Sequence, residues 1–181
     1  MPVKIGSRLP ANSGDPIGWM MDCHRRMENF LSVLVKVGAL HGRQLTGGER
    51  HALEAALRYF REGAPKHTED EEQSLFPRLR SLRSPDMEPL LAYLDGLERE
   101  HAAAERWRQE LDQLGLQWLT AKTLPAAMAE RFRLLTQELA RLYQDHIAVE
   151  EQRVFPLVAA RLPADELRVM GEEMEARRGH R

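Results

Sequence analysis

Residues 67–77 read HTEDEEQSLFP, and residues 146–156 read HIAVEEQRVFP. The two stretches share one pattern: a histidine, three variable residues, two glutamates, glutamine, a variable residue, an aliphatic residue, phenylalanine and proline. On a helix, residues four apart lie on the same face, so His67 shares a face with Glu71 and His146 with Glu150. Imidazole nitrogen and carboxylate oxygen are suitable ligands for a transition-metal ion. The repeated motif therefore indicates a two-metal site, although two similar solvated helix faces are the plainer alternative.

The composition limits the class of protein. A chain of 181 residues with 43% hydrophobic content can form one domain around one core. The net charge of −2 provides no electrostatic basis for binding nucleic acid. The first 15 residues lack the apolar run of a signal peptide, and no stretch is long and apolar enough to span a membrane. With Cys23 as its single cysteine, the chain forms no intrachain disulfide, and we expect a cytoplasmic protein without a membrane partner.

Apolar residues recur at three- and four-residue intervals over four segments, which predicts four amphipathic helices. No segment shows the alternation expected of a strand. Capping residues mark the helix starts at Asp15-Pro16, Thr46 to Glu49, Ser84-Pro85-Asp86 and Thr123-Leu-Pro125. Gly63 and Pro65 predict a kink or break one turn before His67. The longest loop is expected over residues 115–124.

Four such helices joined by short turns predict an all-α fold, an antiparallel up-down-up-down four-helix bundle. His146 follows His67 by 79 residues and His101 follows His24 by 77, so the bundle looks like a duplicated helical hairpin. The expected organisation is a polar lead-in over residues 1–14, the bundle over residues 15–162, and a short, charged C-terminal helix or tail over residues 163–181.

The four histidines are expected at one level of the bundle. Residues equidistant from the turn of an antiparallel hairpin lie side by side, and the midpoints between successive histidines fall in the predicted turns near residues 45, 84 and 123. Two carboxylates in the same core layer would cost several kcal/mol without compensation. Two metal ions would neutralise them and couple folding to metal binding. The predicted metal ligands are His24, His67, Glu71, His101, His146 and Glu150.

These motifs resemble the hemerythrin-like, HHE cation-binding family, in its four-His, two-Glu non-haem di-iron type, over about residues 15–162. The resemblance implies two iron ions bound by the four histidines, with Glu71 and Glu150 and an oxo or hydroxo group as bridges. It also implies a small diatomic or peroxide ligand: O2, peroxide or nitric oxide. Manganese and zinc stay open as alternative metals.

The chain departs from the oxygen-carrying hemerythrins, which use five terminal histidines. Here His41 and His51 are too far from the expected metal layer and His180 is expected in a frayed tail, which leaves four of the seven histidines. This number favours reactive or sensing roles in stress response or redox chemistry over oxygen storage. A non-catalytic oxygen- or iron-sensing module is the alternative, and a purely structural bundle is the third. The ferritin-like di-iron pattern fails because Glu98-x-x-His101 occurs without a second copy.

The sequence leaves open the roles of three side chains near the predicted ligands, and it leaves open the oligomeric state. Glu72 and Glu151 lie about 100° around the helix from the expected bridging glutamates, which favours a solvent-facing or salt-bridging role, with metal ligation in one metal state as the alternative. Tyr143, one turn before His146, is expected to pack in the core, with support of a metal ligand or a redox role as the alternatives. The chain is compatible with a monomer or a homodimer.

Overall fold

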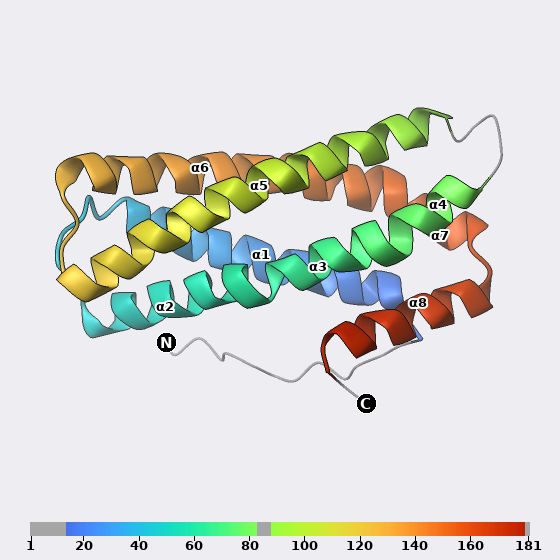
Figure 1. The fold of residues 1–181 in the computed structure, drawn as a ribbon, viewed down its shortest axis with the longest axis horizontal. Helices are drawn as coiled ribbons and strands as arrows, with labels where there is room; N and C mark the ends of the chain where they lie inside the picture. The colour runs from blue at the N-terminus through green and yellow to red at the C-terminus, as the bar shows by residue number, and fades with distance from the viewer. Residues whose placement is uncertain (1–13, 83–87, 180–181) are drawn as a thin grey trace.

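The computed structural model describes residues 14–82 and 88–179 (Figure 1). Every regular element in these ranges is helical, so the prediction of an all-α fold is confirmed. The expected helix start at residues 84–86, the lead-in up to residue 13 and His180 lie outside the described residues. None of the described helices has the length and apolar character needed to cross a membrane.

Within the described residues, four helical runs make up the body of the molecule and a shorter helix follows them. The first run is α1 (Pro16–Gly38). The second comprises α2 (Gly47–Glu62), α3 (Ala64–Asp70), the π-helix η1 (Glu71–Leu75) and α4 (Phe76–Ser81). The third is α5 (Glu88–Ala121), and the fourth comprises α6 (Ala126–Val149), the π-helix η3 (Glu150–Val154) and α7 (Phe155–Arg161). The shorter helix is α8 (Ala164–Arg177).

The four runs pack side by side along the long axis of the molecule (Figure 1). Helix α1 contacts α2 and α6, and α5 contacts the same two helices, so the runs surround a common core as a helical bundle. Helix α8 packs against α1, α3 and η1. The finer prediction, an up-down-up-down order from a duplicated hairpin, stays a prediction.

Capping interactions set the first two helix starts where the sequence predicts them. The side chain of Asp15 accepts a hydrogen bond of 2.8 Å from the backbone N–H of Gly18. The capping box of α2 is complete, because the N–H of Glu49 donates to Oγ1 of Thr46 and the N–H of Thr46 donates to Oε2 of Glu49. These bonds satisfy backbone donors that have no partner within the helix.

The long loop expected over residues 115–124 is wrong, because α5 continues to Ala121. A Cβ atom on Gly115 would lie 2.5 Å from Cδ1 of Leu57, so this glycine permits a close approach of α5 to α2. Three residues later Trp118 is fully buried, and its indole N–H donates a 2.9 Å hydrogen bond to the carbonyl of Arg43. Tertiary packing therefore outweighs the low helix propensity of glycine.

The break predicted before His67 is confirmed, since α2 ends at Glu62 and α3 begins at Ala64. The two π-helical turns were not predicted. Each begins at the first glutamate of the Glu-Glu pair in its motif, Glu71 or Glu150, and ends before Phe-Pro. The N–H of Phe76 donates to the carbonyl of Glu71, and that of Phe155 to Glu150. Proline at the next position has no N–H to continue the α-helical ladder, and π-turns are frequent at functional sites.

Two apolar clusters fill the core on either side of a polar layer. Along α1, Met20 belongs to one cluster and Met27 to the other, with His24 between them. Along α5, Leu97 and Ala104 flank His101 in the same way. The histidines thus occupy a layer enclosed by packed hydrocarbon, where any unpaired charge is costly.

Candidate metal centre

Six buried side chains from the four helical runs converge in this polar layer. They are His24 on α1, His67 on α3, Glu71 at the start of η1, His101 on α5, His146 on α6 and Glu150 at the start of η3. The structure therefore brings together all six residues that the sequence singles out as candidate ligands.

The first set of donors is the His24/His67 group. Nε2 of His24 lies 3.1 Å from Nε2 of His67 and 3.0 Å from Oε2 of Glu150. Nε2 of His67 lies 2.9 Å from Oε1 of Glu71. The four donor atoms of this group lie within 4.8 Å of one another, which is close enough to share one cation.

The second set is the His101/His146 group, and it mirrors the first. Nε2 of His101 lies 3.1 Å from Nε2 of His146 and 3.1 Å from Oε2 of Glu71. Nε2 of His146 lies 3.3 Å from Oε1 of Glu150. These donor atoms also lie within 4.8 Å of one another.

Each glutamate contributes one oxygen to each group. Glu71 directs Oε1 to the His24/His67 group and Oε2 to the His101/His146 group, while Glu150 divides its oxygens the opposite way. A carboxylate that presents one oxygen to each of two centres can bridge them. The arrangement therefore offers two adjacent positions, each with two imidazole nitrogens and two carboxylate oxygens.

The chemistry of these donors fits a pair of cations. All four oxygens of Glu71 and Glu150 are buried and lack a well-aligned hydrogen bond among the described residues, although a histidine Nε2 atom lies 2.9 Å to 3.3 Å from each of them. Buried carboxylate oxygens normally have donors or a bound metal, because their desolvation is otherwise uncompensated. Two Nε2 atoms that face each other can share at most one proton. Cations between these donors would satisfy the oxygens and the nitrogens together.

The pKa values of Glu71 and His146 also indicate that the buried carboxylates are stabilised by nearby positive charge. Burial raises the pKa of Glu71, but the charge of His67 and a bond from His101 outweigh it, so the pKa lies well below its usual value. Burial lowers the pKa of His146, but Glu150 and Glu100 outweigh it and raise the pKa to about 10. Protons on His67 and His146, whose pKa values are raised, thus balance the carboxylates, a role that metal ions would take over.

Three of the histidines have a carboxylate at the other ring nitrogen. Nδ1 of His24 lies 2.9 Å from Glu151, Nδ1 of His101 lies 2.8 Å from Glu72, and Nδ1 of His146 lies 2.8 Å from Glu100. Such a partner keeps the proton on Nδ1 and directs the Nε2 lone pair inward, as in metal sites. Glu72 and Glu151 therefore contact histidines at their outer nitrogens, and Glu151 also forms an ion pair with Arg25.

The two motifs act crosswise. Glu151 and Phe155 belong to the second motif, yet both hold His24 of the first helix, and the Phe155 ring stacks on His24 at 5.4 Å between centroids. In the same way Phe76 of the first motif stacks on His101 at 6.2 Å, with the ring planes 4° apart. Each motif therefore supplies a shared carboxylate, a carboxylate that orients a histidine, and an aromatic ring against that histidine.

One position breaks this symmetry. Glu100 precedes His101 as Cys23 precedes His24, which makes the two residues equivalent in the repeat. Where Glu100 binds His146, the buried thiol of Cys23 interacts with the ring of His67, without an aligned hydrogen bond to Nδ1. Burial raises the pKa of Cys23, but His67 and nearby arginines outweigh it and lower the pKa. The two donor groups therefore differ in their surroundings.

Tyr143 packs in the core beside the centre. Its ring lies 6.3 Å from that of His146 and 6.1 Å from that of Phe60. Burial raises the pKa of Tyr143 to about 12, although Arg108 opposes the rise, so the phenol is neutral near pH 7. The core position agrees with the packing expected from the sequence.

Sequence reasoning missed two acidic residues near the centre, Glu100 and Asp70. Asp70 is fully buried next to Glu71 and pairs with Arg177 at 2.9 Å and with Arg178. No helical spacing links Glu100 to its partner His146, because the two residues are 46 positions apart in the chain. No local pattern could reveal either contact, because both partners come from other helices.

A network from α8 covers the first motif. Nη2 of Arg177 donates to Oγ of Ser74 at 2.6 Å, and Glu173 accepts hydrogen bonds from Ser74 and Arg78. The guanidinium of Arg178 also lies 4.6 Å above the Trp19 ring. In the second motif Val149 stands in place of Asp70 and Arg153 in place of Ser74, so this network serves the first motif.

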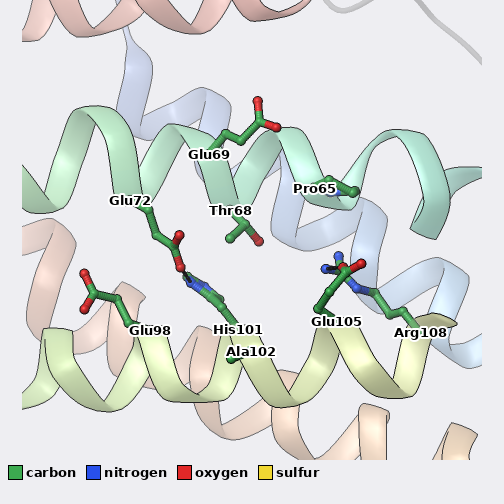
Figure 2. A pocket seen from close by; sticks show the side chains of 9 residues that line it. All are labelled: Pro65, Thr68, Glu69, Glu72, Glu98, His101, Ala102, Glu105 and Arg108. Atoms are coloured by element: carbon green, nitrogen blue, oxygen red, sulfur yellow. Dashed lines mark hydrogen bonds and ion pairs between the residues drawn. The ribbon is translucent and has the colours of Figure 1, made fainter. Parts of the chain in front are cut away.

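A cavity of about 530 Å³ lies beside the His101/His146 group, between α3 and α5 (Figure 2). Its lining comprises Pro65, Thr68, Glu69, Glu72, Glu98, His101, Ala102, Glu105 and Arg108. In Figure 2 the Glu72–His101 contact lies left of centre and the Glu105–Arg108 ion pair lies on the right, with Thr68 between them. The cavity therefore reaches one histidine of the centre.

Comparisons with known proteins agree with this geometry. The family model described as "Hemerythrin HHE cation binding domain" matches residues 15–158. A protein of Haemophilus influenzae described as "Uncharacterized protein" is 30% identical over 172 residues, which cover 93% of this chain and 92% of that protein. No solved structure matches the chain at a comparable level.

Proposed function

Because the chain belongs to the hemerythrin HHE cation-binding domain family, we propose that it is a non-haem di-iron protein that binds or reacts with O2, peroxide or nitric oxide. The observation that carries the proposal is the division of the Glu71 and Glu150 oxygens between two histidine groups. A stress-response or redox role suits such a centre.

In this proposal His24 and His67 would hold one iron, His101 and His146 would hold the other, and Glu71 and Glu150 would be shared between them. When bound, iron supplies redox chemistry and an open coordination position for a small ligand. Glu72, Glu100 and Glu151 hold protons on Nδ1, so that the imidazoles present their Nε2 lone pairs. Phe76 and Phe155 restrict the rings they stack on and keep bulk water away.

The four donors at each position suit zinc as well as iron, and the choice of iron follows from the reactivity that we propose. Each position receives two nitrogens and two oxygens from the chain, and iron commonly accepts six donors, which leaves room for a solvent-derived bridge and an exogenous ligand. Zinc prefers four donors in a closed tetrahedral site. Manganese and zinc are the alternatives that metal analysis must test.

The proposal includes the up-down-up-down order of the bundle. Two observations support it: each of α1 and α5 contacts both α2 and α6, and histidines from four successive runs meet in one layer. A duplicated hairpin would produce this crosswise arrangement, since each half would supply equivalent groups to a shared site.

The first experiment measures the iron content and visible absorption of reconstituted protein. Reduced, iron-loaded protein is exposed to O2 and then purged with argon. We expect two iron ions per chain and a charge-transfer band after oxygen. A band that persists while O2 is consumed supports redox chemistry, and a band that bleaches on purging supports reversible binding.

Variants separate this metal site from adventitious binding. Glu71→Ala/Glu150→Ala should lose the bound iron and the rise in melting temperature that iron causes, because bound metal stabilises only the folded state. Glu138→Ala/Glu172→Ala removes two half-exposed glutamates and serves as the matched control. Equal iron content in both double variants would contradict the proposal.

A non-catalytic sensing module is the second candidate. It is favoured by the ion pairs that join Asp70, the neighbour of Glu71, to Arg177 and Arg178 at the end of α8. Through these ion pairs, metal or ligand binding at the centre would change how α8 packs on the bundle. The reversible outcome of the oxygen experiment, together with a change in proteolysis of α8, would favour sensing.

A further inference from the structure

We propose that the buried guanidinium of Arg108 binds a small carboxylate, whose short apolar group lies in a pocket between α2 and α5. This site involves none of the six candidate metal ligands, and the inference does not depend on the proposed iron chemistry. It assigns a ligand to a buried charged group that takes no part in the candidate metal centre.

Arg108 is a buried cation with unused hydrogen-bond donors. Its side chain is 6% exposed, and its Nη2 donates to Oε2 of Glu105. Nε and Nη1 are buried without a hydrogen-bond partner among the described residues. A guanidinium carries five N–H donors and keeps its proton in proteins, so loss of charge does not relieve the cost of burying them. An acceptor from outside the chain would satisfy these donors.

The guanidinium faces open space on the inner side of two neighbouring hollows. In Figure 2 the head groups of Arg108 and Glu105 meet between α3 and α5, below Pro65. These three residues line the cavity of about 530 Å³ and also line a smaller pocket between α2 and α5. Burial raises the pKa of Tyr143 and the charge of Arg108 opposes the rise, so the guanidinium also acts on the core behind it. Arg108 therefore lies on the wall that the two hollows share.

The smaller pocket has apolar walls and a limited volume. Leu57, Phe60, Pro65 and Leu111 contribute hydrocarbon to its lining. Its volume is about 100 Å³. Because a water molecule takes up about 30 Å³ in the liquid, this space suits a ligand of about three to five non-hydrogen atoms. The apolar walls favour a ligand that carries hydrocarbon beside its polar group.

The charged groups that line the smaller pocket are paired, apart from the unused donors of Arg108. Arg61 donates to Asp112 from Nε at 3.2 Å and from Nη2 at 2.6 Å. Glu105 accepts from Arg108 through one oxygen and from Gln109 at 2.6 Å through the other. A monocarboxylate adds one charge beside an incompletely paired cation, whereas a dianion such as phosphate adds a second charge close to Glu105 and Asp112. The ligand class is therefore a small monocarboxylate with a short hydrocarbon chain.

The carboxylates of the larger cavity do not act against this ligand. Glu72 contacts His101, and Glu98 pairs with Arg80 at 3.0 Å. The side chain of Glu69 points away from the space between α3 and α5 in Figure 2. The approach to Arg108 is therefore close to neutral.

An NMR titration of the full chain with sodium propionate tests the site. Proton–nitrogen spectra detect the Nε–H group of a buried arginine directly. We expect a saturable shift of the Arg108 Nε–H signal and slower exchange of this proton with water. Propionamide, which has the same size without the charge, and phosphate should both cause much smaller shifts.

Three variants, followed through the backbone amides of α5, separate the site from general anion binding. Arg108→Lys keeps the charge but loses the planar donor set, so it should weaken propionate binding by about tenfold or more. Glu105→Gln removes a neighbouring negative charge and should tighten binding by about threefold or more, which no folding defect would produce. Arg131→Lys is the matched control, because Arg131 forms an exposed pair with Glu110, and it should leave the affinity unchanged.

The outcomes separate this inference from the proposed function. Shifts that do not saturate, or an affinity that Arg108→Lys and Glu105→Gln leave unchanged, would overturn it and assign the donors of Arg108 to water. Tighter binding of phosphate than of propionate would overturn the choice of a carboxylate. Binding that requires bound metal and not Arg108 would move the ligand to the metal centre. A chain that takes up no iron yet binds propionate through Arg108 would refute the di-iron proposal alone.

Discussion

The carboxylate of Glu151 lies 2.9 Å from Nδ1 of His24, although 127 residues separate the two in the chain. Glu72 holds His101 in the equivalent way at 2.8 Å. Replacing Glu151 or Glu72 by glutamine should weaken metal binding by about 10- to 100-fold, because the imidazole loses the partner that fixes its orientation. Competition with a metal chelator measures the affinity.

The control for these variants is Glu172→Gln, which alters a half-exposed glutamate paired with Arg168 on α8. It should leave the affinity unchanged. If Glu151→Gln and Glu72→Gln bind metal as tightly as the wild type, then the two carboxylates are only surface partners of the histidines.

The contact between Gly115 and Leu57 predicts opposite effects for two glycines of α5. Gly115→Ala should destabilise the protein by about 1–3 kcal/mol, because the added methyl group would overlap the buried Leu57 side chain. Gly96→Ala has open space around it and should stabilise by about 0.5–1 kcal/mol through helix propensity. Urea unfolding of both variants provides the comparison, and stabilisation by Gly115→Ala would contradict this account of the helix contact.

The buried carboxylate of Asp70 predicts a large cost for removing its partners. Arg177→Ala/Arg178→Ala leaves this charge without its ion pairs and should lower the free energy of unfolding by about 3 kcal/mol. Adding Asp70→Asn should recover part of the loss, since no buried charge then remains. Arg168→Ala is the matched control, because Arg168 forms an exposed pair. Additive effects in this double-mutant cycle would show that the network is not coupled.

The docking of α8 should depend on pH through Glu173. Burial raises the pKa of Glu173, but hydrogen bonds from Arg78 and Ser74 and the charge of Arg177 outweigh it and lower the pKa. A carboxyl with a depressed pKa in the folded state stabilises the protein above its unfolded pKa, and that contribution disappears as the pH falls through the folded pKa.

Thermal unfolding of the wild type and Glu173→Gln between pH 3 and pH 7 tests this linkage. The wild type should be the more stable protein at neutral pH, and the difference should vanish in the acid range. A difference independent of pH would mean that the glutamine variant is destabilised by packing and not by the lost charge.

Much of the candidate site was accessible from the sequence because its signals are local. The spacing of His67 and Glu71, and of His146 and Glu150, places each pair on one helix face whatever the rest of the fold does. The equal spacing of the repeat then indicates that His24 and His101 belong in the same layer. The six side chains do converge, while their role as metal ligands stays a prediction.

The errors and omissions arose where distant packing outweighs local preference. The predicted loop at Gly115 reflects the low helix propensity of glycine, whereas the structure uses the missing side chain to bring α5 against Leu57. The periodicity of the sequence also gives no sign of three other features: the π-turns, the Glu100–His146 contact and the pairing of Asp70 with α8.

The sequence by itself determined an all-helical chain with histidines and glutamates on buried faces, because helix periodicity and capping depend on residues within a few turns of one another. Only the tertiary structure decided that each glutamate divides its oxygens between two histidine groups, that each motif orients a histidine of another helix, and that a cavity adjoins one group while α8 covers the other. These features depend on how the helices rotate and pack against each other, and contacts between remote segments fix that rotation.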